Sequence, residues 1–381
     1  MKPTREQFLP FGLPLLGEEE INEVVATLAS GWLSTGPKTL QFEKEFAAYV
    51  GVKEAVGLTS CTAALHLALL AHGIGAGDEV LLPSFTFAAT ANMVVNVGAK
   101  PIFVDIAEED FCIDPDLLER SITANTKAII VVHYAGLPAR MEAINALAKK
   151  HHLVVIEDAA HAAGSEYKGK KIGGLGNTAS FSFYATKNMS TGEGGMLTTD
   201  DPDVADFVRK NRLHGISKDA WKRYEKEGSW RYDVEYAGWK YNMFDLQAAI
   251  GVHQLRKLDA FLEKRNDYAI QYDNAFEGVK GLILPPKKMD AFHSYHLYPI
   301  RVQSMPRDHF IEKMAERNIG TSVHFIPLHL QSFYQKTFGY REGDLPATER
   351  IFNEIVSIPL YPKMTEEDVA YIIESVHQIL K

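Results

Sequence analysis

The stretch ASFSFYATKNMSTGEGGMLTT runs from Ala179 to Thr199 and carries the strongest indication of fold and chemistry in the chain. Its first part, ASFSFY, alternates as a half-buried strand does, and GMLTT has the composition of a second strand. Between them lie Lys187 and TGEGG, with three glycines in five residues. The two strands are too close in sequence for a helical crossover, so we expect part of the sheet to be antiparallel. Glycines at this point would let the backbone approach a bulky ligand.

Upstream of this stretch, short apolar segments alternate with helical segments between about residue 53 and residue 200. The expected strands are EAVGL, EVLLP, PIFVD, KAIIVVH and LVVIED. Helical periodicity lies between several of them, at Thr62–His72, Phe87–Val97 and Arg140–His151. Strands buried on both faces and joined by helices are typical of a mainly parallel sheet. The sequence therefore predicts an α/β domain.

Helical spacing also recurs near the N-terminus, at Glu19–Ser30 and Lys38–Val50, with the loop sequence GWLSTGP between the two. A long amphipathic helix is expected from Phe244 to Phe276 as a connector. Its candidate buried stripe is Leu246, Ile250, Leu258, Phe261, Leu262, Tyr268 and Tyr272.

The chain changes in character beyond this connector. YHLYPIRV, a helix at Arg307–Asn318, TSVHF and a final helix from Thr365 onward indicate a smaller α+β domain. We therefore expect residues 1–245 to form a large α/β domain and residues 246–381 to form the small C-terminal one.

Composition excludes several classes of protein. The 381 residues are 46% hydrophobic and 23% charged, as in an ordinary globular protein, and the dispersed basic residues with a net charge of −9 argue against nucleic-acid binding. Two cysteines, Cys61 and Cys112, cannot form a disulfide framework, and a reducing cytoplasm is expected. We find no signal-peptide pattern and no apolar run approaching the roughly 18 residues of a membrane span. No His, Cys and carboxylate cluster has metal-ligand spacing, so no metal is predicted.

The stretch GLTSCTAALHLALLA, Gly57–Ala71, places small hydroxyl residues where a strand ends and a helix begins. First-turn N–H groups and the helix dipole would attract an anion, and Ser or Thr hydroxyls would add donors for a phosphate. Simple N-capping by Ser60 explains the same residues. Both interpretations remain open from this stretch alone.

The stretch LVVIEDAAHAAGS, Leu153–Ser165, ends an apolar strand in Glu157 and Asp158. Ligands of α/β sheets bind at the carboxyl ends of the strands, where a carboxylate can hold a protonated ring nitrogen. The alternative is that the carboxylate caps a following helix. His161 would share a face with Asp158 if that turn were helical, and it would then orient the carboxylate or pack against a cofactor.

Lys187 follows the strand ASFSFY and precedes the glycines. A lysine after a strand is usually a solvated surface charge, but desolvation would lower its pKa and let the neutral amine form an imine with an aldehyde. A phosphate-binding helix start, a carboxylate at a strand end and then a lysine are the groups that pyridoxal 5'-phosphate (PLP) requires. The order of these three signals therefore predicts a PLP enzyme with Lys187 as the carrier.

At this point the chain resembles the DegT/DnrJ/EryC1/StrS family of sugar aminotransferases, within the fold-type I PLP enzymes. The resemblance covers essentially the whole chain. It is carried by SGWLSTGP, TSCTAALHLAL, PSFTFAATAN, EDAAHAAGS, FSFYATKNMSTGEGG, YNMFDLQAAIG and VHFIPLH. The fold implied is α/β, of the aspartate aminotransferase type, with a mainly parallel central sheet and a smaller α+β C-terminal domain.

The resemblance also implies roles for individual residues. Lys187 matches the Schiff-base lysine, which in this family also moves the proton between the cofactor and the substrate carbon. The cofactor-binding residues implied are Asp158 at the pyridine nitrogen, His161 beside it, Cys61, Thr62 and Ser182 at the phosphate, Phe87 stacked on the ring and Asn242 reaching the neighbouring subunit's cofactor. That last match implies a homodimer with shared active sites.

The substrates implied are L-glutamate, whose amino group passes to a pyridoxamine form of the cofactor, and a nucleotide-linked keto sugar. GWLSTGP favours relatives that aminate carbon 4 of a 4-keto-6-deoxy sugar, with a UDP-linked one preferred, and amination at carbon 3 is the alternative. Trp32, His324 and His329 are candidates for lining the sugar site, against the alternatives of loop packing and core or surface roles.

Three other functions compete with amine transfer. A family relative with histidine in place of the lysine performs dehydration, and Lys187 favours transamination instead. A non-enzymatic PLP-binding regulator is opposed by the complete set of lysine, aspartate and phosphate-site residues. GGLGNTAS, Gly173–Ser180, resembles a nicotinamide-binding loop, but its glycines precede a strand instead of opening a helix.

Overall fold

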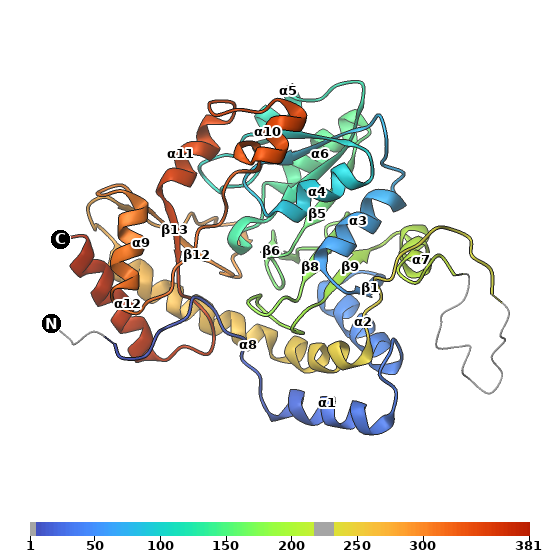
Figure 1. Cartoon of the computed structure of the whole chain (residues 1–381), viewed down its shortest axis with the longest axis horizontal. Coiled ribbons are helices and arrows are strands. Elements are labelled where there is room, and N and C mark those ends of the chain that lie inside the picture. The colour runs from blue at the N-terminus through green and yellow to red at the C-terminus, as the bar shows by residue number, and fades with distance from the viewer. Residues whose placement is uncertain (1–4, 217–231) are drawn as a thin grey trace.

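The computed structural model describes residues 5–216 and 232–381, and its centre is a seven-stranded sheet (Figure 1). The strands, in the order in which they lie side by side, are β1 (Glu54–Leu58), β9 (Gly195–Thr199), β8 (Thr178–Ser182), β5 (Val154–Asp158), β4 (Thr126–Val132), β2 (Glu79–Pro83) and β3 (Lys100–Val104). The pairs from β8 to β3 are parallel, and β9 is antiparallel to both of its neighbours. The mainly parallel sheet with an antiparallel part is confirmed.

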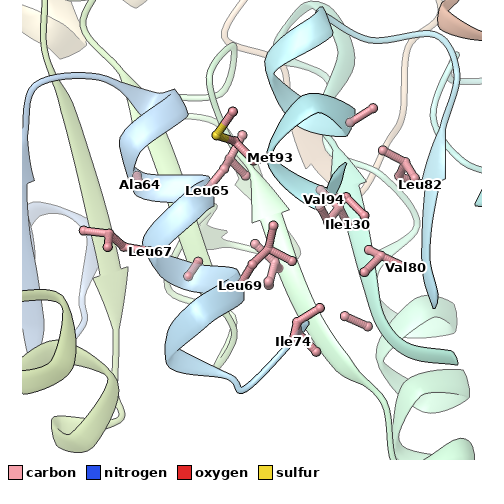
Figure 2. Packing of buried hydrophobic residues seen from close by; sticks show 14 of the residues in the cluster. Ala64, Leu65, Leu67, Leu69, Ile74, Val80, Leu82, Met93, Val94 and Ile130 are labelled. Atoms are coloured by element: carbon pink, nitrogen blue, oxygen red, sulfur yellow. The ribbon is translucent and has the colours of Figure 1, made fainter. Parts of the chain in front are cut away.

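Both faces of this sheet are buried, because alternate residues of each strand pack into different clusters. Ile130 of β4 belongs to the cluster under α3 and α4, whereas Ile129 and Val131 belong to the cluster on the opposite face. Figure 2 shows the first cluster, in which apolar side chains of the two helices meet those of the strands. The helices of this domain are α3 (Cys61–Ala71), α4 (Ala88–Asn96), α5 (Pro115–Arg120), α6 (Met141–His151) and α7 (Pro202–Asn211). This burial explains the nearly continuous apolar runs in the strand sequences.

The helix α8 (Asp245–Phe276) is the long connector that the sequence predicts, and it passes beneath the sheet to the C-terminal region (Figure 1). The helices α1 (Glu18–Ser30) and α2 (Pro37–Val50) pack against it. The expected buried stripe is wrong at its start, because Leu246 and Ile250 are only half-buried. Polar side chains take buried places instead, and each is hydrogen-bonded. Gln254, for example, donates to the Leu15 carbonyl and to Glu20, both at 2.9 Å.

The C-terminal region contains a three-stranded antiparallel sheet in the order β10-β12-β13, with the helices α9 and α12 packed on it. Their bounds are β10 (Leu282–Ile283), β12 (Tyr298–Val302), β13 (Ile355–Ile358), α9 (Arg307–Ala315) and α12 (Glu366–Ile379). TSVHF is not a regular strand, because it forms only a single bridge, between Ser322 and Ser357. The third strand of this sheet is β13, which the sequence analysis missed.

The remaining elements are short. They are the three-stranded sheet of β6 (Glu166–Tyr167), β7 (Lys170–Lys171) and β11 (Ala291–Phe292), the helices α10 (Ser332–Phe338) and α11 (Pro346–Glu354), and the 3-10 turns η1 (Tyr134–Gly136) and η3 (Leu328–Leu330). Side chains of η3 and α10, including Leu328 and Tyr334, pack into the same cluster as α3 and α4. This part of the C-terminal region therefore lies on the large sheet and reaches the ends of its strands. The division at residue 245 remains a prediction.

Candidate active site

A cavity of about 500 Å³ lies at the carboxyl ends of the central strands. Val132 and Asp158 come from the ends of β4 and β5, and Ser182 comes from the end of β8. The segments that follow β1 and β2 add Ser60, Cys61, Thr62, Thr86 and Phe87. This is the edge at which open α/β sheets bind ligands. The volume is within the range of small-molecule sites.

Lys187 lies in the loop after β8 and is partly buried at the cavity wall. Its Nζ is 3.4 Å from His296 Nε2. Burial lowers the pKa of this lysine to about 8, although nearby Cys61 and Asp158 act in the opposite direction. Desolvation disfavours the charged form of an amine, so a larger fraction of Lys187 is uncharged and nucleophilic near neutral pH than of an exposed lysine.

Asp158 lies in the cavity wall with 5% of its surface exposed. Its Oδ2 accepts a 2.7 Å hydrogen bond from Thr90 Oγ1, and its Oδ1 accepts from the Ala160 backbone at 3.2 Å. Burial raises the pKa of the carboxyl, and these two hydrogen bonds lower it. The segment after Asp158 forms turns instead of a helix, so this aspartate is not a helix cap. A buried carboxylate with one wall open to a cavity is suited to pair with a cationic group of a ligand.

Glu157, the neighbouring carboxylate, points away from the cavity because successive residues of a strand face opposite sides. It accepts from His133 Nε2 at 3.0 Å and from Asn177 Nδ2 at 2.8 Å, and it is fully buried. The backbone N–H of Ala139 donates to His133 Nδ1, which fixes the proton of that ring on Nε2. Glu157 therefore belongs to a structural network behind the sheet.

The N-terminus of α3 opens into the cavity. Ser60 has an extended backbone, and its Oγ accepts from the Ala63 N–H at 3.1 Å, so the capping interpretation is confirmed. Ser60, Cys61 and Thr62 also line the cavity, which places the positive end of the helix dipole there. The phosphate interpretation is compatible with this capping, because a cap satisfies only one of the first-turn N–H groups.

The glycines of TGEGG serve the protein backbone as well as the cavity. A Cβ on Gly195 would lie 2.5 Å from the Cys61 nitrogen and 2.3 Å from the Ser60 carbonyl carbon. Glycine is therefore needed at position 195 to let β9 pack against the start of α3. Gly194 lines the cavity. The expectation that these glycines make room for a ligand is thus incomplete. Gly195 makes room for the backbone at the start of α3.

Three buried or partly buried histidines surround the Lys187 amine: His161, His296 and His324. The rings of His161 and His296 are 4.4 Å apart, and His161 stacks on Phe325 at 5.7 Å. Burial, with the charge of Lys187 adding to it, lowers the pKa of His324 to about 3 and holds the pKa values of the other two well below the ordinary histidine range. The three rings are therefore neutral at physiological pH.

Phe87 and Ser182 also lie where the sequence predicts a ligand. Phe87 precedes α4 with 61% of its surface exposed, and its ring is 6.0 Å from that of Phe325. Such an exposed aromatic face at a cavity can stack on a planar ligand. Ser182 is buried at the end of β8, and its Oγ accepts a long hydrogen bond, 3.4 Å, from the Tyr184 N–H.

Three candidates do not line this cavity. His329 is fully buried in η3, where its ring contacts Ser84 Oγ at 2.7 Å and Glu349 at 2.9 Å. His329 is thus a hydrogen-bonded core histidine, which was the alternative to a role in the sugar site. Trp32 is half-buried in its loop and donates from Nε1 to the Thr35 carbonyl at 3.3 Å. Asn242 is buried, and its Nδ2 donates to Thr35 Oγ1 at 2.7 Å.

The cavity-lining residues that sequence reasoning missed include Thr90, His296 and Phe325. Thr90 lies within PSFTFAATAN, where a hydroxyl in the first turn of a helix was the only available signal. His296 lies before a strand in an apolar segment, and nothing local distinguishes it from a core residue. Its contact with Lys187 joins positions 109 apart in the chain.

The described part of the chain contains no group of three or more His, Cys, Asp and Glu side chains placed to hold a metal ion. It also contains no helix long and apolar enough to cross a membrane.

The donor set of the cavity fits PLP. An uncharged amine suits an aldehyde, a buried carboxylate suits a pyridinium nitrogen, and the open start of α3 suits a phosphate. Lys187, Asp158 and Ser60–Thr62 all line one cavity.

Comparisons with known proteins agree with this fit. Residues 14–377 match the profile of the DegT/DnrJ/EryC1/StrS aminotransferase family. The chain is 52% identical to the spore coat polysaccharide biosynthesis protein SpsC of Bacillus subtilis, covering 100% of this chain and 99% of SpsC.

Solved structures extend the agreement to three dimensions. The sugar aminotransferase Spr1654 of Streptococcus pneumoniae, described as putative and solved in its PMP form, is 36% identical with a TM-score of 0.93 over 98% of this chain and 99% of that one. PseC of Helicobacter pylori, an aminotransferase involved in the biosynthesis of pseudoaminic acid, is 31% identical with a TM-score of 0.91 over the same shares of the two chains. The fold and cavity thus define a PLP-dependent sugar aminotransferase. The chain belongs to the DegT/DnrJ/EryC1/StrS aminotransferase family.

Proposed function

We propose that this protein transfers the amino group of L-glutamate to a 4-keto-6-deoxy nucleotide sugar, with a UDP-linked sugar as the preferred acceptor. The observation that carries the proposal is the combination, in one cavity, of the Lys187 amine with a pKa of about 8 and the buried Asp158 carboxylate. An amine with a pKa close to neutral pH has a free-base fraction that can act as a nucleophile, and it can accept and release protons.

Each cavity residue has a distinct part in this proposal. Lys187 is the covalent attachment point for PLP and moves a proton at the reacting carbon. Asp158 holds the ring nitrogen in its protonated state, and His161 packs beside it. Ser182 and the segment Ser60–Thr62 bind the phosphate, and Phe87 covers one face of the ring. When bound, PLP supplies the electron sink that makes this proton mobile and carries the amino group between substrates.

The acceptor class is supported by the relatives' printed functions. SpsC is named for polysaccharide biosynthesis and PseC for pseudoaminic acid biosynthesis, so a sugar acceptor fits both. The loop GWLSTGP favours amination at carbon 4 over the alternative at carbon 3. His324 lines the cavity and Trp32 lies in that loop, and both remain candidates for sugar contacts.

A homodimer with shared active sites is part of the same proposal. Asn242 does not line the cavity of its own chain, and its partner Thr35 lies on the loop between α1 and α2. Phe87 and Tyr184, at the cavity, keep 61% and 47% of their surfaces exposed. A second subunit that contributes Asn242 to this cavity would cover such exposed aromatic surface.

The proposal is tested by borohydride reduction of the PLP-loaded protein, followed by peptide mass spectrometry. The expected result is one reduced PLP adduct on the peptide containing Lys187, and none in the folded Lys187→Ala variant. Incubation with L-glutamate and a panel of keto nucleotide sugars should then give an aminated product, identified by mass and NMR. An adduct on another lysine, or amination that persists in Lys187→Ala, would refute the assignment.

A further inference from the structure

His296 makes the closest polar contact to Lys187 that the structure records, and it has no role in the proposal above. It lies between β11 and β12 with 6% of its surface exposed, and its Nε2 is 3.4 Å from Lys187 Nζ. Its ring packs 4.4 Å from that of His161, which lines the same cavity. The contact is long for a hydrogen bond but within reach of one.

The other ring nitrogen of His296 restricts what this contact can be. Its Nδ1 is buried and has no hydrogen-bond partner within the described chain. A neutral imidazole carries one proton, on either Nδ1 or Nε2. A proton on Nδ1 would be a buried N–H without an acceptor, which is rarer and more costly than an unpaired acceptor. The geometry therefore favours the proton on Nε2, where it faces the lysine.

A proton on His296 Nε2 favours one charge state of Lys187. The free amine has a lone pair that can accept this N–H, whereas an ammonium group has only donors. If Lys187 were charged, His296 would have to shift its proton to Nδ1 to accept from the lysine. A charged Lys187 would therefore require the Nδ1–H tautomer of His296, for which the described part of the surrounding protein offers no acceptor.

The backbone around His296 keeps the ring at this place. Arg265, fully buried on α8, donates from Nη1 to the carbonyls of His296 at 3.3 Å and of Leu360 at 2.7 Å. The Ser294 N–H donates to the Gly136 carbonyl at 3.2 Å. These bonds connect the segment to α8, to the C-terminal region and to the turn η1. The backbone that carries the imidazole is therefore fixed by contacts with separate parts of the fold.

Other charged or titratable groups lie around this pair. Those facing it from the elements packed around it are Asp158, Cys61, His161, His324, Arg265, Tyr184 and Glu193. Asp158 and Cys61 favour a charged lysine, and the neighbouring histidines are neutral. Asp158 is needed in this site but favours the charged amine. A group that favours the uncharged amine must therefore counteract the effect of Asp158 on Lys187.

We propose that His296 is a positioning residue that favours the uncharged form of the Lys187 amine by donating its Nε2–H to the lone pair of that amine. This inference rests on the proposed role of Lys187, and it assigns the residue that prepares the lysine for reaction.

The direct test is the tautomer of His296 in the unmodified protein. Long-range ¹H–¹⁵N NMR of full-length, PLP-free protein labelled with ¹⁵N-histidine distinguishes the two neutral forms. The His296 signals are identified by their loss in His296→Gln. A protonated Nε2 is expected above about pH 8, where the Lys187 amine is free, and a protonated Nδ1 or an imidazolium there would overturn the proposal. This measurement needs no active variant.

The second test measures the charge state of Lys187. Pulse acetylation of the PLP-free protein, read by mass spectrometry of the Lys187 peptide, gives the fraction of free amine between about pH 6 and pH 10. In His296→Gln the midpoint of the Lys187 titration should rise by about one pH unit, because glutamine can present a carbonyl oxygen to the ammonium form. Below the midpoint, this rise makes the free-amine fraction about tenfold smaller. An unchanged or lower midpoint in the folded variant would contradict the inference.

His293→Gln is the matched control for this titration. His293 lies in the same segment and is equally buried, but its Nδ1 accepts from the Tyr295 N–H and its ring stacks on Tyr295. Its substitution should leave the Lys187 midpoint unchanged, and an equal shift in both variants would reveal a general loosening of the segment. Borohydride trapping in the wild-type protein tests the function of Lys187 separately, so failure of the two ideas can be told apart.

Discussion

Thr90 Oγ1 donates a 2.7 Å hydrogen bond to Asp158 Oδ2, and both side chains are buried at the cavity. The bond joins the first turn of α4 to the end of β5. Because it stabilises the ionised carboxylate, it opposes the rise in pKa that burial causes. The threonine therefore helps to keep Asp158 charged.

Thr90→Val should raise the pKa of Asp158 further. A hydrogen bond to a charged group contributes about 1.5–3 kcal/mol, and its loss removes one of the causes that lower this pKa. As the pH falls, the carboxylate would then become protonated at a higher pH than in the wild-type protein. The acid limb of the pH profile of the glutamate half-reaction should therefore move to higher pH. Rates measured by absorbance across pH check this shift. Thr90→Ser keeps the hydroxyl and should retain the wild-type profile, and an identical profile in the valine variant would exclude this role of Thr90.

Asp158→Asn and Glu157→Gln should separate two adjacent carboxylates. We expect Asp158→Asn to bind PLP but to slow the glutamate half-reaction about 100-fold or more, the usual loss when a charge-stabilising group is removed. Glu157→Gln should instead lower the free energy of unfolding by about 1–3 kcal/mol through its network with His133, with the half-reaction retained. Stopped-flow absorbance and urea unfolding measure the two effects. The reverse pattern would show that the carboxylates were assigned incorrectly.

The pKa of about 8 for Lys187 predicts how PLP capture depends on pH. Burial lowers the pKa of the amine, so the free base forms at lower pH than in an exposed lysine. Below pH 8, the capture rate of the PLP-free protein should rise about tenfold per pH unit and then flatten. Stopped-flow absorbance follows capture, and a small primary amine under the same conditions corrects for ionisation of PLP itself. A capture rate that rises only near the pH of an ordinary lysine would contradict burial of the amine.

Asn242 tests the proposed homodimer by complementation. Lys187→Ala and Asn242→Leu should each reduce activity, but a co-expressed mixed dimer would contain one site with both native residues. Such a dimer should recover about half of the wild-type activity, as a two-fold arrangement of shared sites requires. Purification with two different tags isolates the mixed species, and sedimentation gives its mass. A monomer, or a mixed dimer without recovery, would refute the sharing of sites.

His329→Leu tests a candidate that the structure places in the core. The substitution leaves Ser84 and Glu349 without their buried partner, so the free energy of unfolding should fall by about 1–3 kcal/mol. The KM for the keto sugar should not change, because His329 does not line the cavity. Urea unfolding and steady-state kinetics measure the two quantities. A raised KM with unchanged stability would restore His329 to the sugar site.

The local chemistry of the site was readable in the sequence because each signal lies within one short segment. The strand that ends in Asp158, the cap at Ser60 and the lysine after ASFSFY depend on neighbouring residues alone. The apolar runs likewise determined the mainly parallel sheet, and a parallel sheet brings its carboxyl ends to one edge.

Tertiary packing decided which distant groups complete that edge. His296 reaches Lys187 across 109 positions and Thr90 reaches Asp158 across 68, whereas His329, in the motif VHFIPLH, turns into the core. No local pattern encodes these outcomes, because they depend on how loops from separate elements pack over the sheet. The sequence by itself determined the sheet, the lysine and the carboxylate. Only the folded chain determined their partners, since a hydrogen bond between remote residues forms only where packing brings its atoms together.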